Sequence, residues 1–218
     1  MQTKPPASGE TQLIYIHDPM CSWCWGFRPI LGQLLERLPP QLAVMRLLGG
    51  LAPDNDQPMP VEMQRHLQDT WHRIAERIPG TRFNFDFWKR CRPRRSTWPA
   101  CRAVIAARRL DASLEAAMID AIQRAYYLEA RNPSDTDTLA ALAQHLGLDG
   151  ARFVALLDSA ETHTMLDDEM AAARSMGANS FPCLRLRIAE AHWPVPVDYE
   201  RADSMFDTIN ELIDSHAV

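Results

Sequence analysis

The sequence contains no long apolar run and no surplus of basic charge, and we expect no secretory leader. No segment approaches the roughly twenty apolar residues that a membrane-spanning helix needs, so we expect no membrane partner. The net charge is −5, which argues against a nucleic-acid partner, because such proteins usually carry a basic surplus. The first twelve residues are polar and lack the apolar core of a signal peptide. These absences predict a cytoplasmic protein.

Cysteine is scarce and odd in number, with five residues in the chain. In a reducing compartment such a set does not form a disulfide framework. Cys21 and Cys24 enclose a Cys-Ser-Trp-Cys motif, and a close pair of this kind is catalytic, redox-sensing or metal-binding. A zinc site needs about four ligands, but Cys91 and Cys101 do not form a second close pair. The sequence therefore favours redox chemistry and no metal.

Hydrophobic periodicity predicts strands, then helices, then strands again. A buried strand at 13–17 leads into a helix at 21–38, and a second strand follows at 42–48. The predicted middle helices span 63–78, 98–110, 113–128, 135–146, 150–159 and 162–176. The last predicted elements are strands at 182–188 and 193–197 and a helix at 202–215. No glycine stands in the turn between these two strands.

The cysteine pair lies where the first predicted strand enters its helix. Backbone N–H groups and the helix dipole favour an anion at that position, so the pKa of the Cys21 thiol should fall from about 8.5 toward the ~3.5–7.5 range of reactive cysteines. We therefore expect Cys21 to be the exposed nucleophile. Cys24 lies one turn further and is expected to be the resolving thiol. Asp18 would oppose the thiolate if its side chain pointed there.

A proline at the entrance of the third predicted strand completes the pattern, in the segment Asn-Ser-Phe181-Pro182-Cys183-Leu. Together with the cysteine pair, it resembles the DsbA-like branch of the thioredoxin superfamily, and residues 18–27 resemble cytoplasmic DsbA-family proteins regarded as disulfide isomerases. The resemblance implies an α/β thioredoxin fold, βαβ…ββα, with an inserted all-helical domain. The expected boundaries are 12–60 and 177–218 for the thioredoxin halves and 61–176 for the insertion.

The resemblance also implies a function and a substrate-binding surface. It predicts a thiol–disulfide oxidoreductase or isomerase that acts on a protein or small-molecule thiol or disulfide. It needs no cofactor beyond its redox-active disulfide, and glutathione is a candidate co-substrate. Pro182 should be cis and should expose the backbone of Phe181 to substrate. Trp23, between the cysteines, should be partly exposed and serve as a substrate platform. The oligomeric state and the direction of electron flow cannot be deduced from the sequence, although a reducing compartment favours reduction or isomerisation.

Two alternatives remain open at this point. Kappa-class glutathione transferases and 2-hydroxychromene-2-carboxylate isomerases share the architecture, but they usually have serine where Cys21 stands. A metal or redox sensor could use Cys21, Cys24 and Cys183, because Cys183 replaces the small residue that usually follows the family's proline. Packing as a small hydrophobic residue is the preferred interpretation of Cys183. Likewise, His17 is expected to be a core histidine with satisfied ring nitrogens.

Overall fold

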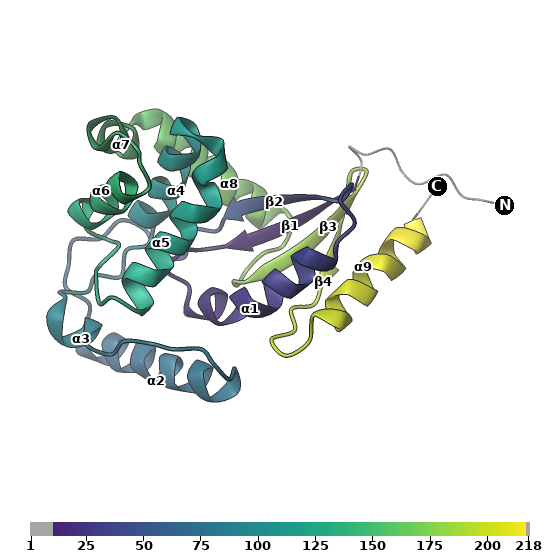
Figure 1. The fold of residues 1–218 in the computed structure, drawn as a ribbon, viewed down its shortest axis with the longest axis horizontal. Helices are drawn as coiled ribbons and strands as arrows, with labels where there is room; N and C mark the ends of the chain where they lie inside the picture. The colour runs from purple at the N-terminus through teal and green to yellow at the C-terminus, as the bar shows by residue number, and fades with distance from the viewer. Residues whose placement is uncertain (1–10, 217–218) are drawn as a thin grey trace.

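The computed structural model describes residues 11–216, which form a four-stranded sheet with helices on both faces and a block of helices at one end (Figure 1). The strands are β1 (Thr11–His17), β2 (Ala43–Leu48), β3 (Cys183–Ile188) and β4 (Ala191–Val195). The helices that pack on the sheet are α1 (Ser22–Arg37), α8 (Ala160–Ser175) and α9 (Ala202–His216). The remaining helices are α2 (Val61–Arg77), α3 (Phe87–Arg90), α4 (Trp98–Leu110), the 3-10 turn η1 (Ala112–Leu114), α5 (Glu115–Tyr127), α6 (Thr136–His145) and α7 (Gly150–Leu157).

The sheet has the strand order β2-β1-β3-β4. Strand β1 runs parallel to β2 and antiparallel to β3, which pairs with β4 as a hairpin. This order and the αβ connections confirm the predicted thioredoxin fold. The β1–β2 pairing is parallel because α1 crosses over between the two strands, as a βαβ unit requires.

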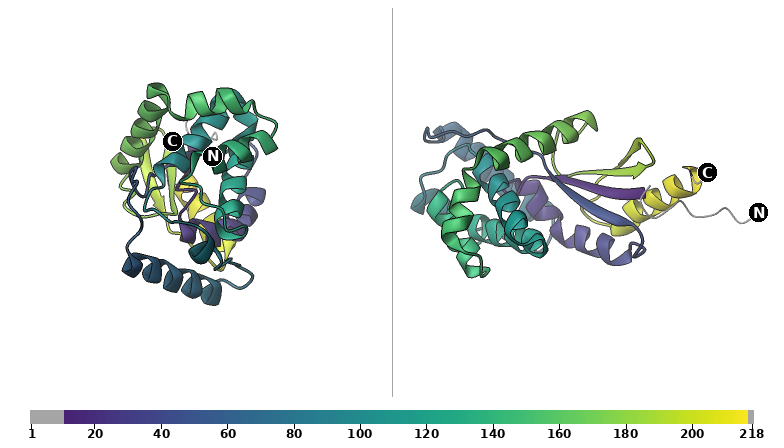
Figure 2. Two further views of the ribbon diagram at one scale, coloured as in Figure 1. Left: turned by 90° about the vertical axis from the view of Figure 1, so that its left-hand side faces the viewer. Right: turned by 90° about the horizontal axis from the view of Figure 1, so that it is seen from above.

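Alternation along the strands divides the core between the two faces of the sheet. Leu13 and Leu184 face α1 and α9, whose apolar residues Phe27 and Met205 complete one core. Ile16, on the opposite side of β1, belongs to the core under α8. Figure 2 shows the resulting layers, with α8 on one side of the sheet and α1 and α9 on the other.

The helical block has its own core, built largely on the alanine-rich helix α4. Trp71 of α2 is fully buried there and stacks on Phe83 with ring centroids 5.0 Å apart. The short helix α3 was not predicted, because four residues are too few to show a helical period. None of the helices in residues 11–216 is both long and apolar enough to traverse a bilayer.

Helix α8 contacts both units of the molecule. Its residues Leu166 and Met170 belong to the core of the helical block, while Ala173 lies in the core under the sheet. The division of the chain at residue 176 therefore stays a prediction, since the last helix of the block also covers the sheet.

Two positions near the sheet restrict the residue that can stand there, one by its backbone conformation and one by the space available. In the turn between β3 and β4, which has no glycine, Ala189 has a φ of 52°. This left-handed conformation disfavours residues with a Cβ. Gly49, at the end of β2, has no room for a side chain, because a Cβ there would lie 2.1 Å from Cζ of Phe181. Gly49 thereby lets the ring of Phe181 lie against the backbone beside β2.

Candidate active site

The two cysteines of the Cys-Ser-Trp-Cys motif occupy the first turn of α1. Cys21 is the N-cap residue, and its Sγ accepts a hydrogen bond from the backbone N–H of Cys24 at 3.4 Å. The same sulfur donates to the carbonyl oxygen of Phe181 at 3.4 Å. Both thiols are free in this structure. The predicted placement of Cys21 at the start of a helix is confirmed.

The two thiols differ in burial and in their surroundings. Cys21 is 5% exposed and Cys24 is 0% exposed, so the prediction of an exposed Cys21 was wrong. The reason is the close approach of the Phe181 segment, which covers the start of α1. Burial raises the pKa of the Cys24 thiol well above its usual value, and the neighbouring Cys21 raises it further. Cys24 is therefore held as a neutral thiol, while the sulfur of Cys21 receives a backbone N–H.

The bond between Phe181 and Pro182 is cis, as the resemblance implied. Phe181 is half-buried and Pro182 is buried at the entrance of β3. Because its carbonyl oxygen is bonded to Cys21, the backbone of Phe181 lies directly against the dithiol. Phe181 and Pro182 therefore adjoin the cysteines in space although they are distant in sequence.

Trp23, between the two cysteines, is half-buried, which agrees with its predicted partial exposure. Its ring packs against Tyr199 with centroids 5.2 Å apart, and the guanidinium of Arg77 lies 5.7 Å from its centre. Arg77 also lies 5.4 Å from the ring centre of Tyr199. Burial raises the pKa of the Tyr199 hydroxyl, as do the nearby thiols of Cys24 and Cys21. No pattern in the sequence indicated that Arg77 and Tyr199 would meet at this site.

Asp18 is a fully buried carboxylate immediately before the motif. It accepts hydrogen bonds from the N–H groups of Met20 at 2.7 Å and Leu51 at 2.8 Å, and from the Thr97 hydroxyl at 2.6 Å. Burial raises the pKa of the Asp18 carboxyl, and these hydrogen bonds oppose the rise. When ionised, Asp18 adds to the raised pKa of Cys24, although burial is the larger cause.

Ser22 fastens the motif to the helical block. Its Oγ accepts a hydrogen bond from the indole N–H of Trp71 at 3.0 Å and from the Tyr127 hydroxyl at 3.5 Å. Trp71 and Tyr127 are fully buried, and Ser22 is 9% exposed. The residue after Cys21 therefore joins α1 to α2 and α5. Sequence reasoning missed this role, because a serine between two cysteines has no periodic pattern.

His17 is buried at the end of β1, but the prediction of a satisfied histidine was wrong. Both ring nitrogens are without a hydrogen-bond partner among the described residues. The ring stacks on Tyr15 at 4.8 Å. Burial, together with the positive charge of Arg46, lowers the pKa of His17 to about 3. His17 is therefore neutral at ordinary pH.

Cys183 does not join Cys21 and Cys24 in a three-thiol site, which the sensor alternative would require. Cys183 pairs with Ile16 across the sheet and packs in the core under α8, on the face of the sheet away from α1. Cys101 instead lies near the motif, with its Sγ 3.5 Å from Oδ2 of Asp18. Within residues 11–216, no group of three histidine, cysteine or acidic side chains is arranged to hold a metal.

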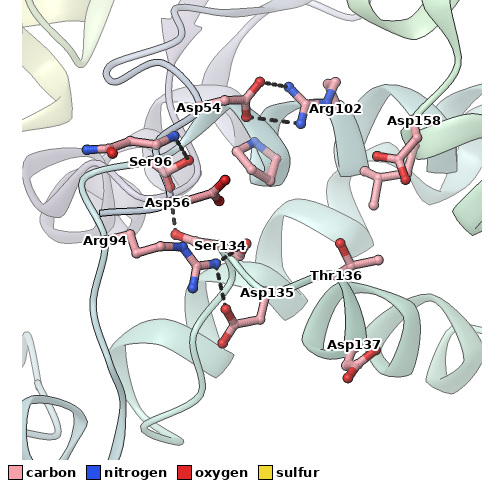
Figure 3. A pocket seen from close by; sticks show the side chains of 13 residues that line it. Asp54, Asp56, Arg94, Ser96, Arg102, Ser134, Asp135, Thr136, Asp137 and Asp158 are labelled. Carbon is pink, nitrogen blue, oxygen red and sulfur yellow. Dashed lines mark hydrogen bonds and ion pairs between the residues drawn. The ribbon is translucent and has the colours of Figure 1, made fainter. Parts of the chain in front are cut away.

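A separate acidic cavity of about 520 Å³ lies away from the cysteines (Figure 3). Figure 3 shows Arg102 bonded to Asp54 and Arg94 bonded to Asp135 at its wall. These ion pairs join the loop after β2 and the segment before α4 to the helical block. The cavity therefore belongs to the contact between loops and helices rather than to the dithiol.

Comparison with known proteins places this site in a family. Residues 12–187 match the model of the DSBA-like thioredoxin domain. No curated protein matches the chain at a significant level. Among solved structures, a candidate protein disulfide isomerase from Nitrosomonas europaea is 25% identical with a TM-score of 0.82, and the match covers 95% of this chain and 99% of that one.

A second similar structure is the cytosolic disulfide reductase DsbM from Pseudomonas aeruginosa, at 28% identity and a TM-score of 0.72, covering 94% of this chain and 97% of that one. A structure of the same protein with GSH is 28% identical with a TM-score of 0.69, and the match covers 94% of this chain and 98% of that one. The family match spans most of the chain and includes Cys21, Cys24 and Pro182. The chain belongs to the DsbA-like family of thiol–disulfide oxidoreductases.

Proposed function

We propose that the protein is a cytoplasmic disulfide reductase or isomerase in which Cys21 is the nucleophile and Cys24 the resolving thiol. The observation that carries this proposal is the asymmetry of the pair. Cys21 caps a helix and receives the Cys24 N–H, a position that stabilises a thiolate, whereas Cys24 is buried and its pKa is raised. The similarity to a cytosolic disulfide reductase supports the reducing direction and the location.

The proposed reaction proceeds in two exchanges. The Cys21 thiolate attacks one sulfur of a substrate disulfide, so that a mixed disulfide forms and the other substrate sulfur leaves as a thiolate. Cys24 then gives its proton to the substrate thiolate that was released, and its sulfur attacks Sγ of Cys21. The second substrate thiol is released, and the enzyme retains a disulfide between Cys21 and Cys24. Two glutathione molecules would return the enzyme to the dithiol and leave as glutathione disulfide.

The substrate is proposed to lie between Trp23 on one side and the segment of Phe181 and Pro182 on the other. The carbonyl oxygen of Phe181 is 3.4 Å from the sulfur of Cys21, so a substrate sulfur that reacts with Cys21 approaches the same backbone. Trp23 supplies a half-buried aromatic surface beside it. Glutathione is proposed as co-substrate because a similar reductase has been solved with GSH.

The proposal is tested by following insulin reduction with glutathione as reductant. Cys21→Ser should abolish the activity, because no sulfur then attacks the substrate. Cys24→Ser should instead accumulate a mixed disulfide that mass spectrometry identifies. Cys183→Ser is the matched control and should remain active, because that thiol lies on the other face of the sheet. Equal activity of wild type and Cys21→Ser would rule out Cys21 as the nucleophile.

A further inference from the structure

A second cavity, separate from the dithiol, has a lining whose charged side chains are all positive. It measures about 370 Å³ and lies between α1, α5 and the segment that follows α2, elements that are labelled in Figure 1. Arg28, Arg82 and Arg124 contribute to its lining, and no acidic residue does so. The chain as a whole has a net charge of −5. The lining of this cavity has the opposite sign, because three arginines from three separate segments contribute to it.

Two of these arginines have no acidic partner. Arg28 is paired with Asp120, but neither Arg82 nor Arg124 forms an ion pair with another residue of the described chain. Arg82 and Arg124 are exposed side chains, and two like charges that line one cavity without an acidic partner attract an anion to it. The planar guanidinium also binds carboxylate and phosphate oxygens in a bidentate manner.

The remaining wall fits an organic ligand rather than a bare ion. Trp25 is held in place by its indole N–H, which donates to the carbonyl oxygen of Arg82 at 3.0 Å, and by stacking on Tyr127 at 5.3 Å. Leu128 adds apolar surface. Thr81, next to Arg82 in the chain, also contributes to the lining.

The segment that carries Thr81 and Arg82 is positioned by the turn after α2. Gly80 has a φ of 88°, a conformation that glycine adopts without strain, and it turns the chain back toward α1. The volume also falls within the range of about 300–1,000 Å³ that is usual for small-molecule sites. The cavity therefore combines a backbone turn at Gly80 with the exposed side chains of Arg82 and Arg124.

From the three arginines, the lack of acidic side chains in the lining and the fixed tryptophan wall, we propose that this cavity binds a small organic anion with two or more phosphate or carboxylate groups. The ligand's acidic groups contact Arg82 and Arg124, and its body lies against Trp25. The site is distinct from the dithiol and does not depend on the direction of the redox reaction.

The test is isothermal titration of the full chain at about 150 mM salt, where contacts with isolated surface charges are largely screened. The probes are pyrophosphate, ATP and citrate. We expect saturable one-to-one binding of at least one probe, with a dissociation constant below about 1 mM. Pyrophosphate and ATP binding without citrate identifies a phosphate ligand, and the reverse identifies a carboxylate ligand; either result supports the site.

Two pairs of substitutions separate this cavity from general charge effects. Arg82→Gln combined with Arg124→Gln should weaken binding by about tenfold or more, because each removed charge-assisted hydrogen bond is worth roughly that factor. Arg65→Gln combined with Arg90→Gln removes the same charge from exposed positions outside the cavity and should leave binding unchanged. Absence of saturable binding of all three probes, or an equal loss in both pairs, would overturn the proposal. Circular dichroism and unfolding temperature confirm that the variants are folded.

Discussion

Replacing Ser22 by alanine tests whether the motif is fastened to the helical block through its serine. The change removes the oxygen that accepts hydrogen bonds from Trp71 at 3.0 Å and from Tyr127 at 3.5 Å. Both donors are fully buried, so water does not replace the lost acceptor without a rearrangement of the core. The indole nitrogen of Trp71 can only donate, whereas the Tyr127 hydroxyl can also accept a hydrogen bond. The lost acceptor therefore costs more at Trp71 than at Tyr127.

The expected magnitude follows from the cost of an unsatisfied buried donor, about 1–3 kcal/mol. Alanine recovers at most about 0.5 kcal/mol through its higher helix propensity. We therefore expect Ser22→Ala to lower the free energy of unfolding by about 1–2 kcal/mol. For a chain of this size each kcal/mol lowers the melting temperature by roughly 2–4 °C. Ser175→Ala, at an exposed position of α8, is the matched control and should change little.

A double-mutant cycle isolates the interaction from the other effects of each substitution. Trp71→Phe removes the indole donor, and the hydroxyls of Ser22 and Tyr127 can still bond to each other. Ser22→Ala should therefore cost less in the Trp71→Phe background, with a coupling energy of about 0.5–1.5 kcal/mol. Urea unfolding of the reduced proteins measures all four free energies. Additive effects, or a Ser22→Ala variant as stable as wild type, would refute the proposed connection.

Three further predictions concern the surroundings of the motif and the turn between β3 and β4. Arg77→Glu should slow the reduction of acidic disulfides such as glutathione disulfide more than that of neutral ones, since Arg77 lies beside Trp23; equal kcat/KM losses for both substrates would contradict this. Burial raises the pKa of Asp18 above 3.8, so its protonation favours the folded state and wild-type stability should fall as pH rises from 3.8 through the raised pKa. Asp18→Asn should remove that decline in urea unfolding at successive pH values, and an unchanged slope would exclude Asp18 as its source. Ala189→Gly should raise the free energy of unfolding by up to about 1 kcal/mol by relieving the left-handed φ; a melting temperature lower than that of wild type would show that the turn is not strained.

The order of strands and helices could be predicted because it depends on local periodicity. Strand β1 and helix α1 each present a continuous apolar face, and the structure places both within a residue or two of the expected bounds. The helix predicted at 63–78 also agrees within two residues with α2. Short or irregular segments such as α3 have no such period, and the sequence did not reveal them.

The alternation of side chains along β3 indicates the face of the sheet on which Cys183 lies. Leu184 and Leu186 face the core next to α1, and a strand reverses the direction of successive side chains. Cys183 therefore had to lie on the opposite face, away from the dithiol, as the structure shows. The proximity of Cys101 to Asp18 had no comparable indicator, because it depends on how α4 packs against the loop before α1.

The contacts around the motif join the thioredoxin unit to the helical block. Ser22, inside the motif, is bonded to α2 and α5, while Asp18, just before it, is bonded to Thr97 at the start of α4. The turn that holds Cys21 is thus fixed from both sides by residues of the helical block. Hydrogen bonds weaken as their geometry departs from the ideal, and the pKa of a reactive thiol depends on such nearby groups. We therefore expect a change in the packing of α2, α4 or α5 to alter the chemistry of Cys21 without touching it.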